Sequence, residues 1–587
     1  MLSLLFFLLL IVFLPVNLSA QADSTSLWGS ENTKRFATMP IQLPLSMAGG
    51  FAEIRPNHFH SGVDIRTGGK EGIKVYAPDD GYVSRINISA WGGGKVLYIT
   101  HPNGYKTVYM HLSDFCGAIG RFVHDYQYSN HTFAFDIDLP KDSIPVKKGQ
   151  LVALTGNTGG SAGPHLHYEI RLAENDQTIN PLYFKLPYSD PVAPTIAGIK
   201  IYPSDKHSTI NGKNQEIKIF PVNKKNRTTN DTTLVSGPFY VGIYTYDQME
   251  LGARNKNGVD KIELFVDGTL FHRYHVPTFM FEETRAINAI IDYPQYQRTR
   301  EYYIVTRHLR GNRNNFCMAF KNNGYIVFDD NNTHRLEYRV SDHKGNTTRH
   351  SFFVRSSNPT SATQHSISDN DEPSILQTDG EPITYFKRFR MQRPGFSTDI
   401  KPYTVYENDM LIYRCSQDPA GLSQQHHLSL KRHQLPPHQS FDVAISAPSS
   451  LPDNLTDKLT IVCINGKNIS ALPTRHDGML LRASSRSFGA FAVRLDTVPP
   501  TVKPVNFTEG KSLKSSKITV KITDNLTGIV SYSCYIDGQW QLAEHDGKTS
   551  TLNVDSALLH KGRNKVTFRL ADAVGNTVEQ SWSILKN

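Results

Sequence analysis

Short runs of alternating apolar and polar residues, separated by turn residues, fill most of this chain. Two such runs flank Asn103-Gly104 in "KVLYITHPNGYKTVYMHL" (95–112), and two flank Asp80-Gly81 in "IKVYAPDDGYVSRI" (73–86). A period of two is typical of strands with one buried face, and Asn-Gly and Asp-Gly suit the positive φ angles of two-residue hairpin turns. The pattern predicts an all-β protein, in which a small antiparallel sheet domain is followed by about three β-sandwich domains.

An internal repeat divides the C-terminal two-thirds. "DPVAPTI" (190–196) recurs as "DTVPPTV" (496–502), and "LEYRVSDHKGNTTRHSFFV" (336–354) recurs as "VTFRLADAVGNTVEQSWSI" (566–584). Both copies have a Pro-rich entry, a strand ending in Asp, an Asp-Gly hairpin and a final D-x-x-G-N hairpin. These features predict immunoglobulin-like sandwiches at 189–355 and 496–587. The first copy carries an insertion between Asp267 and Asp342.

The remaining segments differ in composition. The apolar run "MLSLLFFLLLIVFLPVNLSA" (1–20), followed by "AQA", predicts a cleaved signal peptide and export to the periplasm or cell envelope; membrane association would require that the signal is retained. A polar stretch with scattered aromatic residues (114–146) predicts a long inserted loop within a domain at 21–188. A Ser/Thr/Asn/Asp-rich linker is expected at 356–374, followed by a β-rich domain at 375–495 that has no repeat partner.

Charge and cysteine content exclude two classes of function. The net charge of +9 is spread over 587 residues without basic runs, which argues against nucleic-acid binding through a Lys/Arg stripe. The five cysteines lie far apart and form no C-x-x-C pair. They predict neither a disulfide framework nor a thiolate zinc site, and each is interpreted as a small buried apolar residue.

Histidines and an aspartate form a pattern that suits a metal. His60 and Asp64 lie in "NHFHSGVDIRTGG" (57–69), and His165 and His167 form an H-x-H in "SAGPHLHYEIR" (161–171). Residues i and i+2 of a strand share a face, so both imidazoles should converge while Leu166 points to the core. Two imidazoles and one carboxylate are typical of a catalytic zinc ion, because the fourth position stays open.

The chain resembles a known family at these motifs. H-x-x-x-D, then Y-x-H-L, then H-L-H-Y-E, in this order over about residues 36–181, is similar to the M23 (lysostaphin/LytM-like) zinc metallopeptidases. The resemblance implies that His60, Asp64 and His167 bind one Zn²⁺ ion. It makes His111 and His165 the catalytic pair beside the metal, and it leaves His58 outside the metal shell.

The resemblance also implies an activity. We expect a secreted zinc endopeptidase that hydrolyses amide bonds in the peptide cross-links of peptidoglycan, with zinc-bound water as the nucleophile. One histidine would act as general base and the other would stabilise the developing charge. Two alternatives stay open: a non-catalytic activator of cell-wall amidases, and a scaffold or adhesion protein that acts through its sandwich domains. The bond that is cut, the identity of the base and the oligomeric state are not defined by the sequence.

Several other features have two interpretations. The stretch between His111 and Gly149 is longer than is usual in the family, and it is expected to wall the groove or alter access without removing a ligand. The glycines before the H-x-H suit either tight turns or a close approach of the backbone to substrate: Gly156, Gly159, Gly160 and Gly163. Carboxylates at the strand ends suit calcium, although turn formation accounts for them as well: Asp247, Asp342, Asp524 and Asp572.

Overall fold

The structure of the chain is a computed structural model that describes residues 36, 38–219, 232–250, 255–314, 316–358, 380–432, 434–448 and 451–587. The predicted signal peptide at 1–20 lies outside these residues. The described chain is almost entirely β, as predicted, and folds into four units: the first (36–188), the second (189–358), the third (380–495) and the fourth (496–587). The first unit has one long helix, α2 (Gly117–Asn130).

Two antiparallel sheets form the first unit. The larger sheet has the strand order β1-β4-β13-β8-β7-β6-β10, and the smaller has the order β5-β12-β9. The bounds of the larger sheet are β1 (Met47–Gly49), β4 (Val63–Arg66), β6 (Gly81–Ile88), β7 (Lys95–Thr100), β8 (Tyr105–Met110), β10 (Phe135–Asp138) and β13 (His165–Leu172). Those of the smaller are β5 (Lys74–Tyr76), β9 (Asp114–Phe115) and β12 (Leu151–Leu154). A β2–β3 hairpin (Ile54–Arg55 and His58–Phe59) precedes β4.

One of the two predicted hairpins in this unit is confirmed and the other is wrong. β7 and β8 pair across Asn103-Gly104, and Gly104 has φ 84°. β5 and β6 both exist on either side of Asp80-Gly81, but they belong to different sheets. Gly81 does not make a positive-φ turn; a Cβ atom there would lie 2.4 Å from the carbonyl oxygen of Thr100. This glycine therefore serves a close backbone approach rather than a hairpin.

The predicted inserted loop at 114–146 is largely regular structure. It contains β9, helix α2, β10 and β11 (Pro145–Val146). Ile119, Val123 and Gln127 are the buried residues of α2, and they follow one another at helical spacing. The loop prediction was wrong because a polar amide occupies the third position of this stripe. The Gln127 amide is satisfied there by donating to the carbonyl oxygen of Phe133 at 2.8 Å.

Each of the later units has two sheets that enclose a core. In the second unit the orders are β17-β15-β19-β23 and β16-β18-β26-β25-β20-β21-β24. The bounds are β15 (Thr195–Pro203), β16 (Thr209–Ile210), β17 (Ile217–Ile219), β18 (Thr233–Ser236), β19 (Phe239–Tyr246), β20 (Lys261–Val266), β21 (Thr269–His275), β23 (Ile304–Val305), β24 (Cys317–Ala319), β25 (Thr333–Ser341) and β26 (Thr347–Asn358). The insertion also holds β22 (Thr278–Phe279), α3 (Ile287–Ile290) and α4 (Tyr293–Thr299). Since β26 continues to Asn358, the predicted linker begins too early; its remainder, 359–374, lies outside the described residues.

The third unit has the orders β27-β30-β31-β37-β33-β34 and β28-β29-β32-β36-β35, and the fourth has β38-β39-β43-β42 and β41-β40-β44-β45. Third-unit bounds are β27 (Glu381–Ile383), β28 (Phe389–Arg393), β29 (Phe396–Ile400), β30 (Asp409–Gln417), β31 (Gln424–Leu430), β32 (Phe441–Ser446), β33 (Leu459–Asn465), β34 (Asn468–Ala471), β35 (Thr474–Asp477), β36 (Leu480–Ser485) and β37 (Gly489–Leu495). Fourth-unit bounds are β38 (Thr501–Pro504), β39 (Lys517–Thr523), β40 (Ile529–Ile536), β41 (Gln539–Gln541), β42 (Glu544–Asp546), β43 (Thr551–Asp555), β44 (Gly562–Asp572) and β45 (Thr577–Lys586).

The hairpins of the internal repeat are confirmed. Asp267-Gly268 joins β20 to β21 and Asp537-Gly538 joins β40 to β41, with positive φ angles at all four residues. Such angles at both central positions are the mark of the turn that matches strand twist. The D-x-x-G-N segments join β25 to β26 and β44 to β45.

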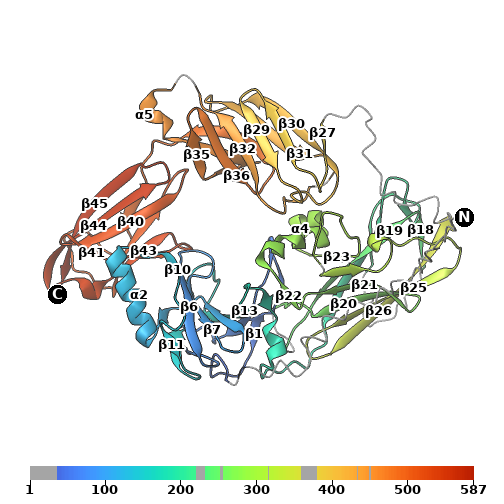
Figure 1. Ribbon diagram of the computed structural model, residues 1–587, viewed down its shortest axis with the longest axis horizontal. Helices are drawn as coiled ribbons and strands as arrows, with labels where there is room; N and C mark the ends of the chain where they lie inside the picture. The colour runs from blue at the N-terminus through green and yellow to red at the C-terminus, as the bar shows by residue number, and fades with distance from the viewer. Residues whose placement is uncertain are drawn as a thin grey trace, which may run out of the picture.

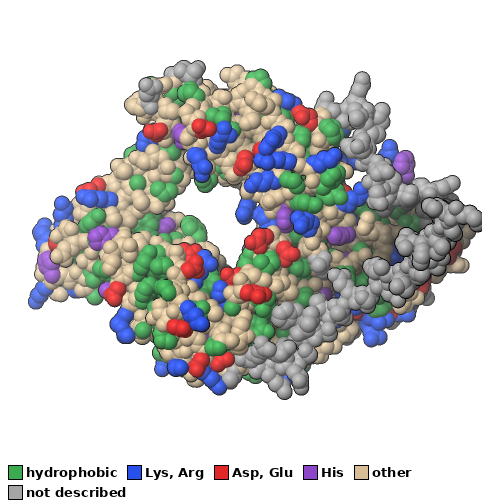
Figure 2. Space-filling model, viewed as in Figure 1, with side chains coloured by type: hydrophobic (Ala, Val, Ile, Leu, Met, Phe, Trp, Pro, Cys, Tyr) green, Lys and Arg blue, Asp and Glu red, His purple; other side chains and the backbone are tan. Residues whose placement is uncertain are grey.

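The four units form a ring (Figure 1), and its central opening persists when side chains are drawn (Figure 2). The ring closes where the fourth unit meets the first. Lys95 Nζ lies 2.6 Å from Glu544 Oε1, and Trp540 packs against Tyr128 and His131 of the α2 region, with ring centroids 5.2 and 5.0 Å apart. Units that are far apart in the sequence are thus in direct contact.

The cysteines and the helices add two observations. The five thiols are free, but Cys415 is exposed and Cys116 is half-buried, so the expectation that all are buried was wrong. Cys415 lies near the end of β30, where the strand becomes exposed. Within the described ranges, no helix is both long and apolar enough to span a membrane.

Trp540→Ala should open the ring. The substitution removes the aromatic contacts with Tyr128 and His131, and each such contact contributes about 0.5–1.5 kcal/mol beyond its buried area. We expect a larger radius of gyration by small-angle X-ray scattering. Val530→Ala, at an exposed site of the same unit, is the control and should leave the scattering unchanged. An unchanged radius for Trp540→Ala would contradict the role given to this contact.

Candidate metal centre

The pairing of β13 with its two neighbours brings the motif residues together. β13 lies between β4 and β8, and its register places His167 opposite Asp64 on one side and opposite Met110 on the other. His165 and His167 share a face of β13, while Leu166 is fully buried in the core. The predicted convergence of the two imidazoles is confirmed.

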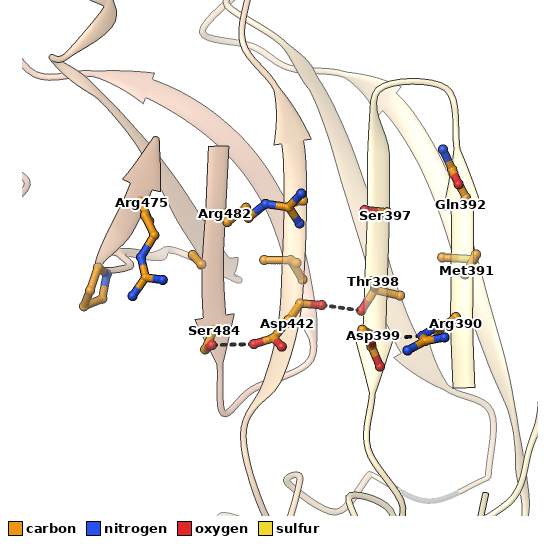
Figure 3. A pocket seen from close by; sticks show the side chains of 14 residues that line it. Arg390, Met391, Gln392, Ser397, Thr398, Asp399, Asp442, Arg475, Arg482 and Ser484 are labelled. Atoms are coloured by element: carbon orange, nitrogen blue, oxygen red, sulfur yellow. Dashed lines mark hydrogen bonds and ion pairs between the residues drawn. The ribbon is translucent and has the colours of Figure 1, made fainter. Parts of the chain in front are cut away.

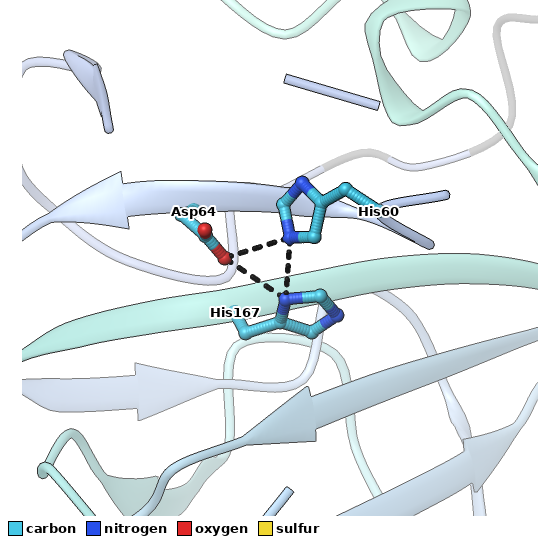
Figure 4. Close-up of side chains that lie close together, drawn as sticks. All are labelled: His60, Asp64 and His167. Atoms are coloured by element: carbon cyan, nitrogen blue, oxygen red, sulfur yellow. Dashed lines mark hydrogen bonds and ion pairs between the residues drawn. The ribbon is translucent and has the colours of Figure 1, made fainter. Parts of the chain in front are cut away.

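Three side chains form a compact buried cluster (Figure 4). His60 Nε2 lies 3.0 Å from Asp64 Oδ1 and 2.9 Å from His167 Nδ1, and His167 Nδ1 lies 2.9 Å from the same carboxylate oxygen. The residues are only 3%, 5% and 5% exposed, respectively. One oxygen and two nitrogens therefore meet at a single point.

The outer ring nitrogens of His60 and His167 make hydrogen bonds that determine whether the inner nitrogens carry lone pairs. His60 Nδ1 donates to the carbonyl oxygen of Gly50 at 2.7 Å, and His167 Nε2 donates to Glu169 Oε1 at 2.9 Å. In neutral rings the opposite nitrogens then carry lone pairs that face Asp64. Three acceptors facing one another in a buried place need a positive charge between them. The donor set and its outer hydrogen bonds suit a metal of the zinc type.

Glu169 is a part of the centre that sequence reasoning missed. It is completely buried and also accepts hydrogen bonds from Ser61 and Arg171, both at 2.5 Å. Burial would raise its pKa, but Arg171 and His167 outweigh burial and lower the pKa to about 2. The sequence does contain the pattern that indicates this role: H-x-H-x-E places Glu169 on the same face of β13 as both histidines.

Arg55 orients the carboxylate. Its guanidinium donates to Asp64 Oδ2 at 2.7 Å, which leaves Oδ1 for the cluster. Burial opposes ionisation of Asp64, but the neighbouring His60 and the other hydrogen-bonded histidines hold the pKa of this carboxyl well below its usual range. Asp64 is thus an anion, as a metal ligand must be.

The two clustered histidines respond differently to this environment. Burial lowers the pKa of His60 to about 4. Burial also disfavours a charged His167, but the hydrogen bonds that this ring donates to Asp64 and Glu169 outweigh burial and raise its pKa to about 9. A proton on His167 and a metal ion are therefore alternative ways to neutralise the same carboxylates.

His111 and His165 lie beside the cluster. Their ring centroids are 4.8 Å apart, and His111 is 6.0 Å from His167. His111 has φ 62°, and its Nδ1 donates to the carbonyl oxygen of Thr158 at 2.9 Å, so its Nε2 is a free acceptor. Burial, reinforced by the two neighbouring histidines, lowers the pKa of His111 to about 3.

His165 is held in the same way. Its Nδ1 lies 2.8 Å from the carbonyl oxygen of Gly163, and its Nε2 lies 3.3 Å from Asp64 Oδ1. All five residues singled out in the sequence thus come together. The arrangement offers a metal position with two further imidazoles at its edge.

Two of the four glycines are required by backbone contacts between loops. A Cβ atom on Gly156 would lie 2.4 Å from the amide nitrogen of Ser113. Gly159 has φ 67°, and a Cβ atom there would lie 2.3 Å from the amide nitrogen of Gly94. A Cβ on Gly163 meets nothing within 4 Å. The close approach at these two positions is to the protein's own backbone.

His58 and Phe59 show how the turn before His60 is anchored. His58 is exposed, and its Nδ1 lies near the carbonyl oxygen of Pro56, away from the cluster. Phe59 is buried in the core of the second unit, with ring centroids 5.6 Å from Phe279 and 5.3 Å from Phe316. The second unit therefore holds the residue next to the first candidate ligand.

A hollow of about 680 Å³ in the third unit contains none of this chemistry (Figure 3). Arginines and carboxylates on β28, β29, β32 and β36 line it, and Arg390 is already paired with Asp399 at 3.1 Å. Its lining includes no histidine or cysteine. The histidine cluster of the first unit is the stronger candidate site.

Comparison with known proteins agrees with this geometry. Residues 58–128 and 135–181 match the family model described as Peptidase family M23, and residues 381–496 match a Zu5-like domain. An uncharacterized metalloprotease of Haemophilus influenzae is 36% identical over 163 residues, which cover 26% of this chain and 28% of that protein. The peptidoglycan DD-endopeptidase ShyB of Vibrio cholerae is 34% identical over 111 residues, 19% of this chain and 20% of that protein.

A comparison with solved structures matches a similar share of the chain. The catalytic domain of the M23 protein EnpA from Enterococcus faecalis is 25% identical and covers 25% of this chain and 95% of its own, with a TM-score of 0.19. The matched part of the chain spans 20–28% of the length of these curated relatives. The first unit therefore contains a segment similar to M23 peptidases, and it is followed by further β domains, one of them Zu5-like.

Phe59→Ala should destabilise the first and second units together. Truncating a buried phenylalanine leaves a cavity and reduces the free energy of unfolding by about 3–5 kcal/mol. We expect a lower midpoint in thermal or denaturant unfolding. Phe386→Ala, at an exposed site, is the control and should change the midpoint little. Equal midpoints for both variants would contradict the shared core.

Proposed function

We propose that the protein is an exported zinc endopeptidase that hydrolyses amide bonds in the peptide cross-links of peptidoglycan. The observation that supports it most directly is the meeting of His60 Nε2, Asp64 Oδ1 and His167 Nδ1 at 2.9–3.0 Å, with the outer nitrogens of both rings already donating elsewhere. Two imidazoles and one carboxylate form the ligand set of catalytic rather than structural zinc. These three residues would hold one Zn²⁺ ion per chain.

Zinc at this position would polarise the scissile carbonyl and acidify a water molecule. The chain's own residues do the rest. One of the two edge histidines removes a proton from the attacking water, and in both rings Nε2 is available for this because Nδ1 donates to a backbone carbonyl. The other histidine, whose ring centroid lies only 4.8 Å away, would stabilise the charge that develops on the carbonyl oxygen when its Nε2 carries a proton. The carbonyls of Thr158 and Gly163 hold these rings in place.

The substrate class rests on the relatives. The Vibrio and Neisseria proteins are named as a peptidoglycan DD-endopeptidase and a DD-carboxypeptidase/endopeptidase, and a Staphylococcus capitis relative is named as a glycyl-glycine endopeptidase. Endopeptidase activity is common to these names, and the Vibrio name specifies peptidoglycan as the substrate. The apolar segment at 1–20 agrees with export to the periplasm or cell envelope, where such a substrate occurs.

The five polar residues should separate into two groups by zinc content. His167→Ala and Asp64→Ala remove ligands, so we expect both zinc and activity to be lost. His111→Ala and His165→Ala leave the ligands intact, so zinc should remain while turnover of purified cross-linked muropeptides falls by about 10²–10⁴-fold. Zinc is measured by atomic absorption and products by mass spectrometry.

His58→Ala is the matched control, since this exposed histidine lies in the same turn and should keep both zinc and activity. A wild-type protein that binds zinc but cleaves no muropeptide would overturn the enzymatic proposal in favour of a regulatory role. A wild-type protein as free of zinc as His167→Ala would overturn the metal assignment as well.

Glu169→Gln should weaken zinc binding without removing a ligand. The amide cannot match the charge that Glu169 places behind His167, and loss of such a partner reduces metal affinity roughly 10–100-fold. Competition with a chromogenic chelator measures the affinity. Glu263→Gln, which affects an ion pair in the second unit, is the control. Unchanged affinity in Glu169→Gln would contradict the positioning role of this carboxylate.

A further inference from the structure

Two clusters of three aspartates occupy equivalent places in the second and fourth units. We call them the entry triads: Asp190, Asp247 and Asp342 in the second unit, and Asp496, Asp524 and Asp572 in the fourth. In each triad, one carboxylate oxygen per residue lies within 4.8 Å of the others. The same arrangement of aspartates is thus present in both domains that contain the repeated sequence motifs.

Each entry triad joins three separate parts of its unit. Asp190 lies on the segment that enters the second unit, Asp247 follows β19 of one sheet, and Asp342 follows β25 of the other sheet. In the fourth unit, Asp496 lies on the entering segment, Asp524 follows β39 and Asp572 ends β44. A ligand held by all three carboxylates would clamp the entering segment to both sheets.

An asparagine frames both clusters identically. Asn346 Nδ2 donates to Asp342 Oδ2 at 2.7 Å and to the carbonyl oxygen of Asp190 at 2.9 Å. Asn576 Nδ2 donates to Asp572 Oδ2 at 2.7 Å and to the carbonyl oxygen of Asp496 at 3.0 Å. These bonds orient the carboxylates but leave their charges unpaired.

The middle aspartate of each triad has an oxygen with no partner. Asp247 is only 2% exposed, and its Oδ1 is buried without a hydrogen bond, although it lies in a group of three carboxylates. Asp524 Oδ1 is also buried without a hydrogen bond. Across the described ranges, no lysine, arginine or histidine forms an ion pair with any of the six aspartates. A buried oxygen of this kind needs a donor or a cation.

The pKa shifts in the second unit indicate that the negative charge of its triad is not compensated. Burial and the charges of Asp190 and Asp342 raise the pKa of Asp247 to about 7. Burial and Asp342 likewise raise the pKa of Asp190 to about 6, although the nearby His343 and Lys344 act in the opposite direction. The positive groups near this triad therefore do not compensate its charge.

A polar residue at the same repeat position contacts the triad in each unit. Asn257-Gly258 in "NGVDKIELFVDG" corresponds to Thr527-Gly528 in "TGIVSYSCYIDG". The Asn257 side-chain oxygen is buried without a partner, and its backbone pairs with that of Asp247. Thr527 donates its hydroxyl to Asp496 at 2.7 Å. The same repeat position therefore contacts an aspartate of the triad in each unit, through the backbone of Asn257 in one and the hydroxyl of Thr527 in the other.

We propose that the entry triads are calcium sites that fix each sandwich domain to the unit before it. All the ligand atoms offered are oxygens, which excludes the softer preferences of zinc and copper. Three carboxylates on one site suit Ca²⁺, whereas Mg²⁺ keeps most of its water and is usually bound through one or two carboxylates. This proposal does not depend on peptidase activity, because neither triad includes a residue of the histidine cluster.

Calorimetric titration of the full chain with calcium chloride tests the proposal. The protein is first passed over a chelating resin, and its zinc is then restored. We expect two calcium ions per chain for the wild type, one for Asp247→Asn and one for Asp524→Asn. Asparagine keeps the shape of the side chain and removes repulsion, so each variant should fold and, without calcium, melt no lower than the wild type.

Asp267→Asn and Asp537→Asn are matched controls, because these aspartates lie in the Asp-Gly turns of the same two domains, outside the triads. Both should bind two calcium ions. The proposal is overturned if the wild type binds no calcium, if Asp247→Asn and Asp524→Asn bind as many ions as the wild type, or if magnesium chloride produces an equal titration.

Discussion

The pairing of β13 between β4 and β8 is the constraint on which the candidate site depends. Its register places His167 opposite Asp64 and, through alternation, aligns His165, His167 and Glu169 on one face. A slip of one residue would turn Leu166 toward the cluster and both histidines into the core. Because Leu166 and Ile170 are fully buried, the hydrophobic core opposes that slip. The chemistry of the site is thus maintained by side chains that do not take part in it.

A second constraint acts on the turn before β4. Phe59 belongs to the core of the second unit, while His60, the next residue, belongs to the buried cluster of the first. The amide of Phe59 also donates to the Thr284 hydroxyl of the second unit at 2.7 Å. Two domains therefore share a single short hairpin, so packing in the sandwich determines where the ring of His60 lies.

The sequence predicted features that depend on local geometry and missed those that depend on distant contacts. The H-x-H alternation and the Asp-Gly and D-x-x-G-N turns follow from strand and turn geometry, and they were correct. The Asp80-Gly81 hairpin failed because a neighbouring carbonyl, that of Thr100, determines the need for glycine there. Helix α2 was missed because Gln127 is polar yet buried. Glu169 was overlooked although H-x-H-x-E places it on the face of both histidines; of its partners, only Ser61, 108 residues away in the chain, is brought to it by folding.

The contact of Lys95 with Glu544 and of Trp540 with Tyr128 turns a linear string of domains into a closed loop. In an open string, each junction can bend independently of the others. In a loop, a rotation at one junction must be accommodated by compensating rotations at the rest, so the four units move as a linkage with few degrees of freedom. A change at the entry to the fourth unit is consequently transmitted to the first, even though some three hundred residues lie between their attachment points along the chain.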